Sequence, residues 1–139
     1  MIDVREYEMT DYFDVSRILK EAFDVSKANV NPDDNYKELV ATIDNKPVGY
    51  LVLTKVLDLV KGKPYFLVDY VCVDSNYRNL GIGYKLMDKV LEIASSYDGL
   101  YIELTSRRER VAAHHLYEKA GYVRRDSFIY RRVLQWLLI

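Results

Sequence analysis

The alternation of apolar and polar residues predicts strands and helices in turn along this chain. Residues 2–8 alternate in the manner of a half-buried strand. The stretches from Thr10 or Asp11 to Phe23 and from Ile82 to Ala94 repeat apolar residues with the period of an amphipathic helix. Residues 39–43 and 48–54 flank a polar turn at 44–47, which predicts a hairpin.

The second half of the chain continues the pattern. Residues 66–73 and 100–105 are β-branched and aromatic runs, which favour strands. Residues 111–120 predict a last helix ended by Gly121, and residues 122–125 and 128–133 predict two closing strands. The order β-α-β-β-β-α-β-α-β-β predicts an α+β fold in α/β/α layers. Its sheet is expected to be mixed, mostly antiparallel and twisted, with helices on both faces.

Composition narrows the class of protein. The chain has 139 residues, of which 50% are hydrophobic and 29% charged, so we expect a single soluble domain spanning residues 1–139. A formal net charge of −1 gives no overall attraction to nucleic acid or to an anionic membrane. One cysteine forms no internal disulfide, and the polar start and the absence of a long apolar run argue against a signal peptide or membrane span. We therefore expect a cytoplasmic protein.

The strand at 66–73 leads into a glycine-bearing loop and a helix. Gly81 and Gly83 bracket Ile82 at the expected start of that helix. The first N–H groups of a helix have no internal partner and favour an anion, and glycine lets a ligand approach the backbone, so this arrangement predicts phosphate binding. Tyr84 excludes a Walker loop, and the bulky Leu86 excludes a dinucleotide fingerprint.

Two motifs resemble one known family. The string Arg78-Asn-Leu-Gly-Ile-Gly83 resembles the Arg-x-x-Gly-x-Gly pyrophosphate loop of the GNAT superfamily of N-acetyltransferases. Ala113-His-His-Leu-Tyr-Glu-Lys-Ala-Gly-Tyr122 resembles the family's second signature, and both lie in an element order that such domains share. Many members carry Asn where this chain has Arg110. The resemblance implies an acyl-CoA N-acyltransferase fold and acetyl-CoA as cosubstrate.

The resemblance also implies roles for particular residues. Val71, Cys72 and Val73 would hold the pantetheine arm through their backbone, and a backbone N–H near Val71 would polarise the thioester carbonyl. The pyrophosphate would be bound by N–H groups of the loop, with charge added by Arg78 or Lys85; the loop residues are Asn79, Leu80, Gly81, Ile82, Gly83 and Tyr84. Arg110, in the charged loop before the last helix, would contact the 3′-phosphate end of CoA or an acidic substrate. Tyr117 would protonate the departing thiolate.

Acetyl transfer to an amine also requires a base, because amines are mostly protonated at neutral pH. Asp69 and Glu103 lie among apolar strand residues, where desolvation would raise the pKa of a carboxyl group. Each matches a position at which some GNAT members have a catalytic Glu. The sequence leaves three alternatives open: Asp69, Glu103, or no single base.

The expected function is N-acetyltransfer from acetyl-CoA to a primary amine, directly and within a ternary complex. The acceptor class is open between small molecules and protein N-termini or lysines, and a longer acyl group is a further alternative. A non-catalytic sensor or assembly module that binds acyl-CoA is the alternative from another class. No metal is expected, since His114 and His115 lack ligand spacing. The apolar residues 135–139 either pack back on the sheet or contribute to a homodimer.

Overall fold

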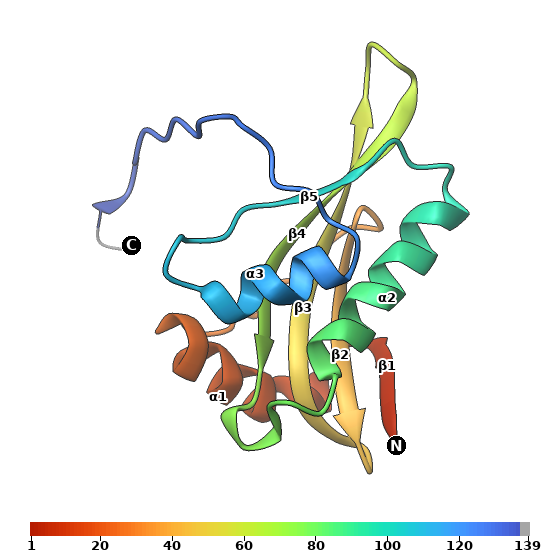
Figure 1. Ribbon diagram of the computed structural model, residues 1–139. Helices are drawn as coiled ribbons and strands as arrows, with labels where there is room; N and C mark the ends of the chain where they lie inside the picture. The colour runs from red at the N-terminus through yellow and green to blue at the C-terminus, as the bar shows by residue number, and fades with distance from the viewer. Residues whose placement is uncertain (137–139) are drawn as a thin grey trace.

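A computed structural model describes residues 1–136 of the chain. Its centre is a five-stranded sheet in the order β1-β2-β3-β4-β5 (Figure 1). The strands pair antiparallel from β1 to β4, and β5 runs parallel to β4. They span Ile2–Glu6 (β1), Tyr36–Ile43 (β2), Lys46–Asp58 (β3), Lys63–Val73 (β4) and Ile102–Leu104 (β5). The predicted mixed, mostly antiparallel sheet is confirmed.

Helices cover both faces of this sheet, as predicted. They are α1 (Tyr12–Phe23), α2 (Ile82–Ser96) and α3 (Val111–Lys119), with short 3-10 helices η1 (Met9–Asp11) and η2 (Ser75–Tyr77). The apolar side chains of α1 pack against Val40, Tyr50 and Cys72 on one face. Those of α2 pack on the other face with Leu39, Leu51 and Phe66, and α3 joins this second cluster.

The side chains of the central strands explain why helices cover both faces of the sheet. Along β2, Leu39 and Ala41 face α2 while Val40 faces α1, and all three are buried. A strand with apolar side chains on both faces must be covered on both. Full burial of a side chain such as Leu51 stabilises the fold by about 1.5–3 kcal/mol. The core therefore consists of two layers separated by the sheet.

The chain after α3 differs from the prediction. The closing strands expected at 122–125 and 128–133 are wrong, because the described backbone from Val123 to Trp136 contains no strand. Most apolar residues of this segment are exposed, among them Phe128 at 83% and Tyr130 at 93%. Their alternation is typical of a strand, but a strand also needs a paired edge, and this segment leads away from β5 (Figure 1). Residues 137–139, the end of the predicted apolar terminus, lie outside the described residues.

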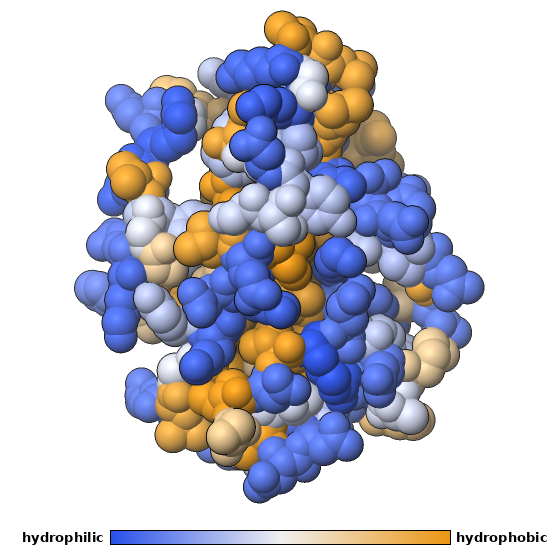
Figure 2. Space-filling model, turned by 90° about the vertical axis from the view of Figure 1, so that its right-hand side faces the viewer, coloured by the Kyte–Doolittle hydropathy of each residue, from blue (hydrophilic) through white to orange (hydrophobic). Residues whose placement is uncertain are grey.

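A second exposed apolar region lies at the turn between β3 and β4. Leu57, Leu59 and Val60 are exposed there at 57%, 87% and 95%. Figure 2 shows apolar surface at the top of the molecule, where Figure 1 has this turn. Among residues 1–136, no helix is long and apolar enough to cross a membrane.

Candidate active site

The sheet opens at the middle of β4. Pairing between β4 and β5 is limited to Phe66–Val68 against Ile102–Leu104. Beyond this point residues 69–73 have no strand beside them on the β5 side, within the part of the chain that the structure describes. Backbone N–H and C=O groups along such an edge are free to bind an extended ligand. The residues expected to hold the pantetheine arm, Val71, Cys72 and Val73, lie on this open edge.

A β-bulge marks the same place. Tyr50 of β3 pairs with Cys72, but Val52 pairs with Asp69, so one residue of β3 faces two of β4. Within the bulge Tyr70 has a positive φ of 57°, which is unusual for a residue other than glycine. Bulges bend a strand and redirect its side chains, and they recur beside functional sites. Here the bulge coincides with the point where β4 and β5 separate.

Helix α3 brings its N-cap Arg110 and, in its second half, Tyr117 to this open edge. Tyr117 is half-buried, and this desolvation raises the pKa of its hydroxyl group; the positive charge of Arg110 acts in the opposite direction. Burial also raises the pKa of the Cys72 thiol to about 12, again opposed by Arg110. Arg110, Tyr117 and Cys72 are therefore electrostatic neighbours. A thiol with such a pKa is protonated at neutral pH, which excludes Cys72 as a thiolate nucleophile.

Arg110 also connects α3 to the opposite face of the sheet. Its guanidinium group lies 4.5 Å from the ring centroid of Phe23, at the end of α1. The Phe23 ring in turn contacts Tyr70 edge-to-face, with centroids 5.3 Å apart. The end of α1, the bulge of β4 and the start of α3 thus converge, with Phe23 between Arg110 and Tyr70.

The phosphate loop, Arg78–Tyr84, lies at the N-terminus of α2. Its first helical hydrogen bond is donated by the Lys85 N–H to the Gly81 carbonyl (3.0 Å), so the preceding N–H groups are available to a ligand. Gly81 has φ +81° and open space around it, whereas a Cβ on Gly83 would lie 2.8 Å from Leu116 of α3. One glycine therefore permits the turn, and the other permits α3 to pack against α2.

Two polar contacts fix the start of this loop to α1. Buried Asp74 accepts a hydrogen bond from the Asn76 N–H (3.0 Å) and pairs with Arg17 (2.9 Å). Ser75 donates from its N–H and its hydroxyl to the two carboxylate oxygens of Glu21, at 3.0 and 2.8 Å. The contacts with Arg17 and Glu21 could not be predicted from the sequence, because these two residues lie far from the loop along the chain.

The two candidate bases occupy different positions on one face. Phe66 and Val68 pack on the α2 side, so Asp69 points to the α1 side of the sheet. Glu103 is the partner of Leu67 and points to the same side. Asp69 lies where the strands separate, and desolvation of its carboxyl group raises its pKa. Both residues are exposed, but Glu103 lies within the paired part of β5.

The large pocket lies on the α1 face, next to Asp69. It has a volume of about 300 Å³ and is bounded by α1, the α1–β2 loop and strands β2 to β4. This is the lower end of the range typical of small-molecule sites. Its lining residues are Leu19, Val25, Ser26, Lys27, Ala28, Val30, Pro32, Tyr36, Glu38, Tyr50, Val52 and Tyr70.

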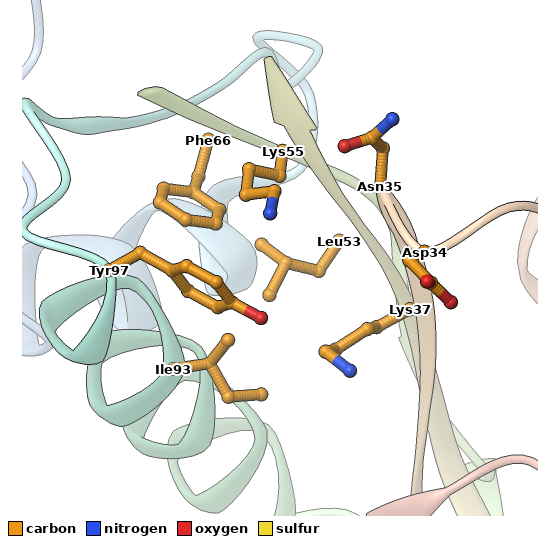
Figure 3. Close-up of a pocket in the computed structure, with 8 residues that line it drawn as sticks. All are labelled: Asp34, Asn35, Lys37, Leu53, Lys55, Phe66, Ile93 and Tyr97. Atoms are coloured by element: carbon orange, nitrogen blue, oxygen red, sulfur yellow. The ribbon is translucent and has the colours of Figure 1, made fainter. Parts of the chain in front are cut away.

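A second cavity, on the α2 face, is too small for a substrate. Its volume is about 10 Å³, room for roughly one water molecule. Figure 3 shows Lys55 and Tyr97 pointing toward each other across it, with the Lys55 Nζ 4.2 Å from the ring centroid. This cavity lies toward the C-terminal end of α2, away from the phosphate loop.

The sequence profile of the acetyltransferase (GNAT) family matches residues 1–122. No curated protein sequence matches the chain.

Solved structures share the fold. A Trypanosoma brucei acetyltransferase has a TM-score of 0.80 and 18% identity, covering 96% of this chain and 100% of its own. Ribosomal-protein-alanine N-acetyltransferase from Brucella melitensis has a TM-score of 0.76 and 21% identity, covering 94% of this chain and 99% of its own. An aminoglycoside acetyltransferase from an uncultured soil metagenomic sample, in complex with sisomicin, has a TM-score of 0.81 and 16% identity. The match covers 96% of this chain and 97% of that protein.

Proposed function

Because the chain belongs to the GNAT family of acetyltransferases, we propose that it transfers the acetyl group of acetyl-CoA directly to a primary amine. The observation that carries this proposal is the open edge of β4 at its bulge. Tyr117 and Arg110 lie at this edge, the phosphate loop lies near its end, and the large pocket opens on its other side.

The residues present fit acetyl-CoA. The segment Val71–Val73 leaves the backbone groups on its β5 side without a strand partner among residues 1–136, and these groups can bond to the amides of the pantetheine arm. The N–H groups of Ile82, Gly83 and Tyr84 point out of the start of α2, where an anion gains about 0.3–2 kcal/mol from the helix end. Asn79, Leu80 and Gly81 extend this surface, and exposed Arg78 adds a positive charge. Bound there, acetyl-CoA supplies an activated acyl carbon.

The proposed chemistry needs two proton transfers by this chain. Asp69 removes a proton from the acceptor ammonium and passes it to solvent, which leaves a neutral amine. The new C–N bond forms as the C–S bond breaks, and the N–H of Val71 stabilises the charge on the carbonyl oxygen. Tyr117 gives its phenol proton to the leaving sulfur. The proton released from the new amide nitrogen returns to Tyr117 through water.

Asp69 is favoured over Glu103 as the base. It lies at the separation of β4 and β5, opposite Val52, which lines the large pocket. Desolvation raises the pKa of its carboxyl group, which makes it a stronger proton acceptor than an ordinary carboxylate. Glu103 lies in the paired part of β5 and has no comparable position beside the pocket.

We further propose a homodimer in the cytosol. The exposed apolar residues of the C-terminal segment, including Phe128, Tyr130 and Trp136, would be covered by a second copy of the chain. The free, buried Cys72 suits a reducing compartment. Sedimentation of the whole chain should give a dimer that Tyr130→Asp weakens, whereas a monomer in both would contradict this assignment.

The proposed function is tested by acetyl-CoA turnover, measured as thiol release with a panel of amines, and by acetyl-CoA binding measured separately. Tyr117→Phe should lower kcat by about 10²–10⁴ while leaving acetyl-CoA affinity unchanged. Tyr122→Phe is the matched control, because its buried hydroxyl lies near Tyr117 yet has no hydrogen-bond partner among residues 1–136. Binding without turnover on any amine would favour the non-catalytic sensor, and absence of binding would refute the assignment.

A further inference from the structure

The large pocket has walls that are almost entirely apolar. Nine of its twelve lining residues are aliphatic or aromatic, and they come from five different elements or loops. Val30, Tyr36 and Tyr70 remain exposed at 66%, 46% and 49%, although they are large hydrophobic side chains. Exposed apolar side chains gathered around a concave opening are typical of a ligand site, because a ligand would remove them from water.

The polar residues of the pocket already neutralise one another. Glu38 is the one carboxylate in the lining. Its Oε1 accepts hydrogen bonds from the Tyr50 hydroxyl (2.6 Å) and from the Lys27 ammonium (2.8 Å). The Lys27 side chain is only 9% exposed, and it donates a second bond to the Ala28 carbonyl (2.8 Å). The lining therefore has no net charge and no carboxylate free of a counterion.

This charge balance distinguishes between classes of amine. A polyamine or an aminoglycoside carries several positive charges, and each one buried without a partner costs free energy. The single Glu38 is compensated by Lys27, so the pocket cannot neutralise a second or third ammonium group. An uncharged apolar substituent, by contrast, meets walls that suit it.

The position of the pocket orients such an acceptor. Tyr70 lines it and lies in the bulge directly after Asp69, whose strand partner Val52 also lines the pocket. An amine whose substituent fills the pocket therefore has its nitrogen at the β4 end, beside the proposed base. A volume of about 300 Å³ accommodates one aromatic or branched aliphatic group.

We propose that the acceptor is a small monoamine with one uncharged, apolar substituent, aromatic or branched aliphatic, and that polycationic amines are poor acceptors. This inference rests on the proposed function, because it assigns the acceptor of that same site.

The test compares 2-phenylethylamine and 3-methylbutylamine with spermidine and sisomicin, each with acetyl-CoA and the whole chain. We expect kcat/KM for the two apolar monoamines to exceed that for the polycations at least about ten-fold. Val30→Asp places a new carboxylate at the exposed rim and should shift this preference toward spermidine by about ten-fold. Val60→Asp makes the same change at the distant β3–β4 turn and should leave the preference unaltered.

Faster turnover of spermidine or sisomicin than of the monoamines would overturn the inference and leave the proposed function standing. Turnover confined to peptide N-termini, with none on the monoamines, would also overturn it. If no amine is acetylated, the proposed function fails instead. Calorimetric binding of 2-phenylethylamine to the CoA-saturated protein, weakened by Val30→Asp and not by Val60→Asp, would then still support the pocket's assignment.

Discussion

The two sides of the open β4 edge are built on different physical principles. The phosphate loop is one continuous segment, Arg78–Tyr84, and it offers mainly backbone N–H groups. The large pocket is assembled from α1, the α1–β2 loop and three strands, and it offers mainly side chains. Backbone recognition suits a phosphate group that is the same in every complex. The side chains of a pocket wall, by contrast, can differ between proteins that bind different acceptors. The difference indicates that the two sides can be altered separately, and substitutions can test this.

The largest effect is expected at Asp69, where the two sides meet. Asp69→Asn removes the proposed base and should lower kcat/KM by about 10²–10⁴. The raised pKa means that wild-type activity should fall, as pH decreases, at a pH above the ordinary aspartate value of about 3.9, because the base must be ionised. The residual activity of Asp69→Asn should not show this fall at low pH.

Glu103→Gln is the control for this prediction. It neutralises a carboxylate on the same face of the neighbouring strand β5, where Glu103 pairs with Leu67, two residues before Asp69. It should leave both kcat/KM and the loss of activity at low pH unchanged. A loss of activity in Glu103→Gln with normal activity in Asp69→Asn would reverse the assignment. Equal, small losses in both would indicate that neither residue acts alone.

The second effect tests how the phosphate loop depends on α3. Gly83→Ala places a Cβ 2.8 Å from Leu116 and should destabilise the fold by about 1–3 kcal/mol, measured by urea unfolding. Because the clash is with one side chain, Leu116→Ala in the same chain should remove most of the added cost. Gly81→Ala has open space but a positive φ, so its cost of about 1–2 kcal/mol should be independent of Leu116.

Additivity of Gly83→Ala and Leu116→Ala would contradict this explanation of Gly83. The pair of glycines also shows what sequence spacing can and cannot reveal. Both were identified as parts of one loop, but only the structure separates the glycine that permits the turn from the one that permits helix packing.

The same contrast explains which parts of the molecule could be predicted. The order of elements through α3 and the mixed sheet followed from local periodicity, as did the phosphate loop as a strand-loop-helix segment. The large pocket could not be predicted, because Lys27, Glu38 and Tyr50 meet only after the strands have paired. Strand register also had to be seen before Asp69 and Glu103 could be assigned to one face.

The error at residues 122–133 has a related cause. The alternation of apolar and polar residues indicates only that a segment could be a strand. Whether it becomes one depends on a free edge within reach, which is a property of the assembled fold. Most apolar residues from Val123 to Trp136 are exposed, and the described part of this segment does not pair with β5.

The smallest effect concerns the link between the two sides. Arg17, on the helix that borders the large pocket, pairs with Asp74, which fixes the start of the phosphate loop. Arg17→Met should reduce stability by about 1 kcal/mol, because Asp74 keeps its bond from the Asn76 N–H. It should also weaken acetyl-CoA binding a few-fold without changing the preference among amines. Asp14→Asn, at Arg17's exposed partner, should have neither effect.

The pH dependence of this loss identifies its origin. Burial alone would raise the pKa of Asp74, but the bonds from Asn76 and Arg17 outweigh it and lower the pKa in the folded protein. A group with a depressed folded pKa contributes stability above its unfolded pKa, and that stability is lost as pH falls through the folded value. The difference between wild type and Arg17→Met should therefore be full at neutral pH and shrink below about pH 4. A pH-independent difference would mean that Arg17 acts through its packing on α1, and the two sides of the site would then be independent at this point.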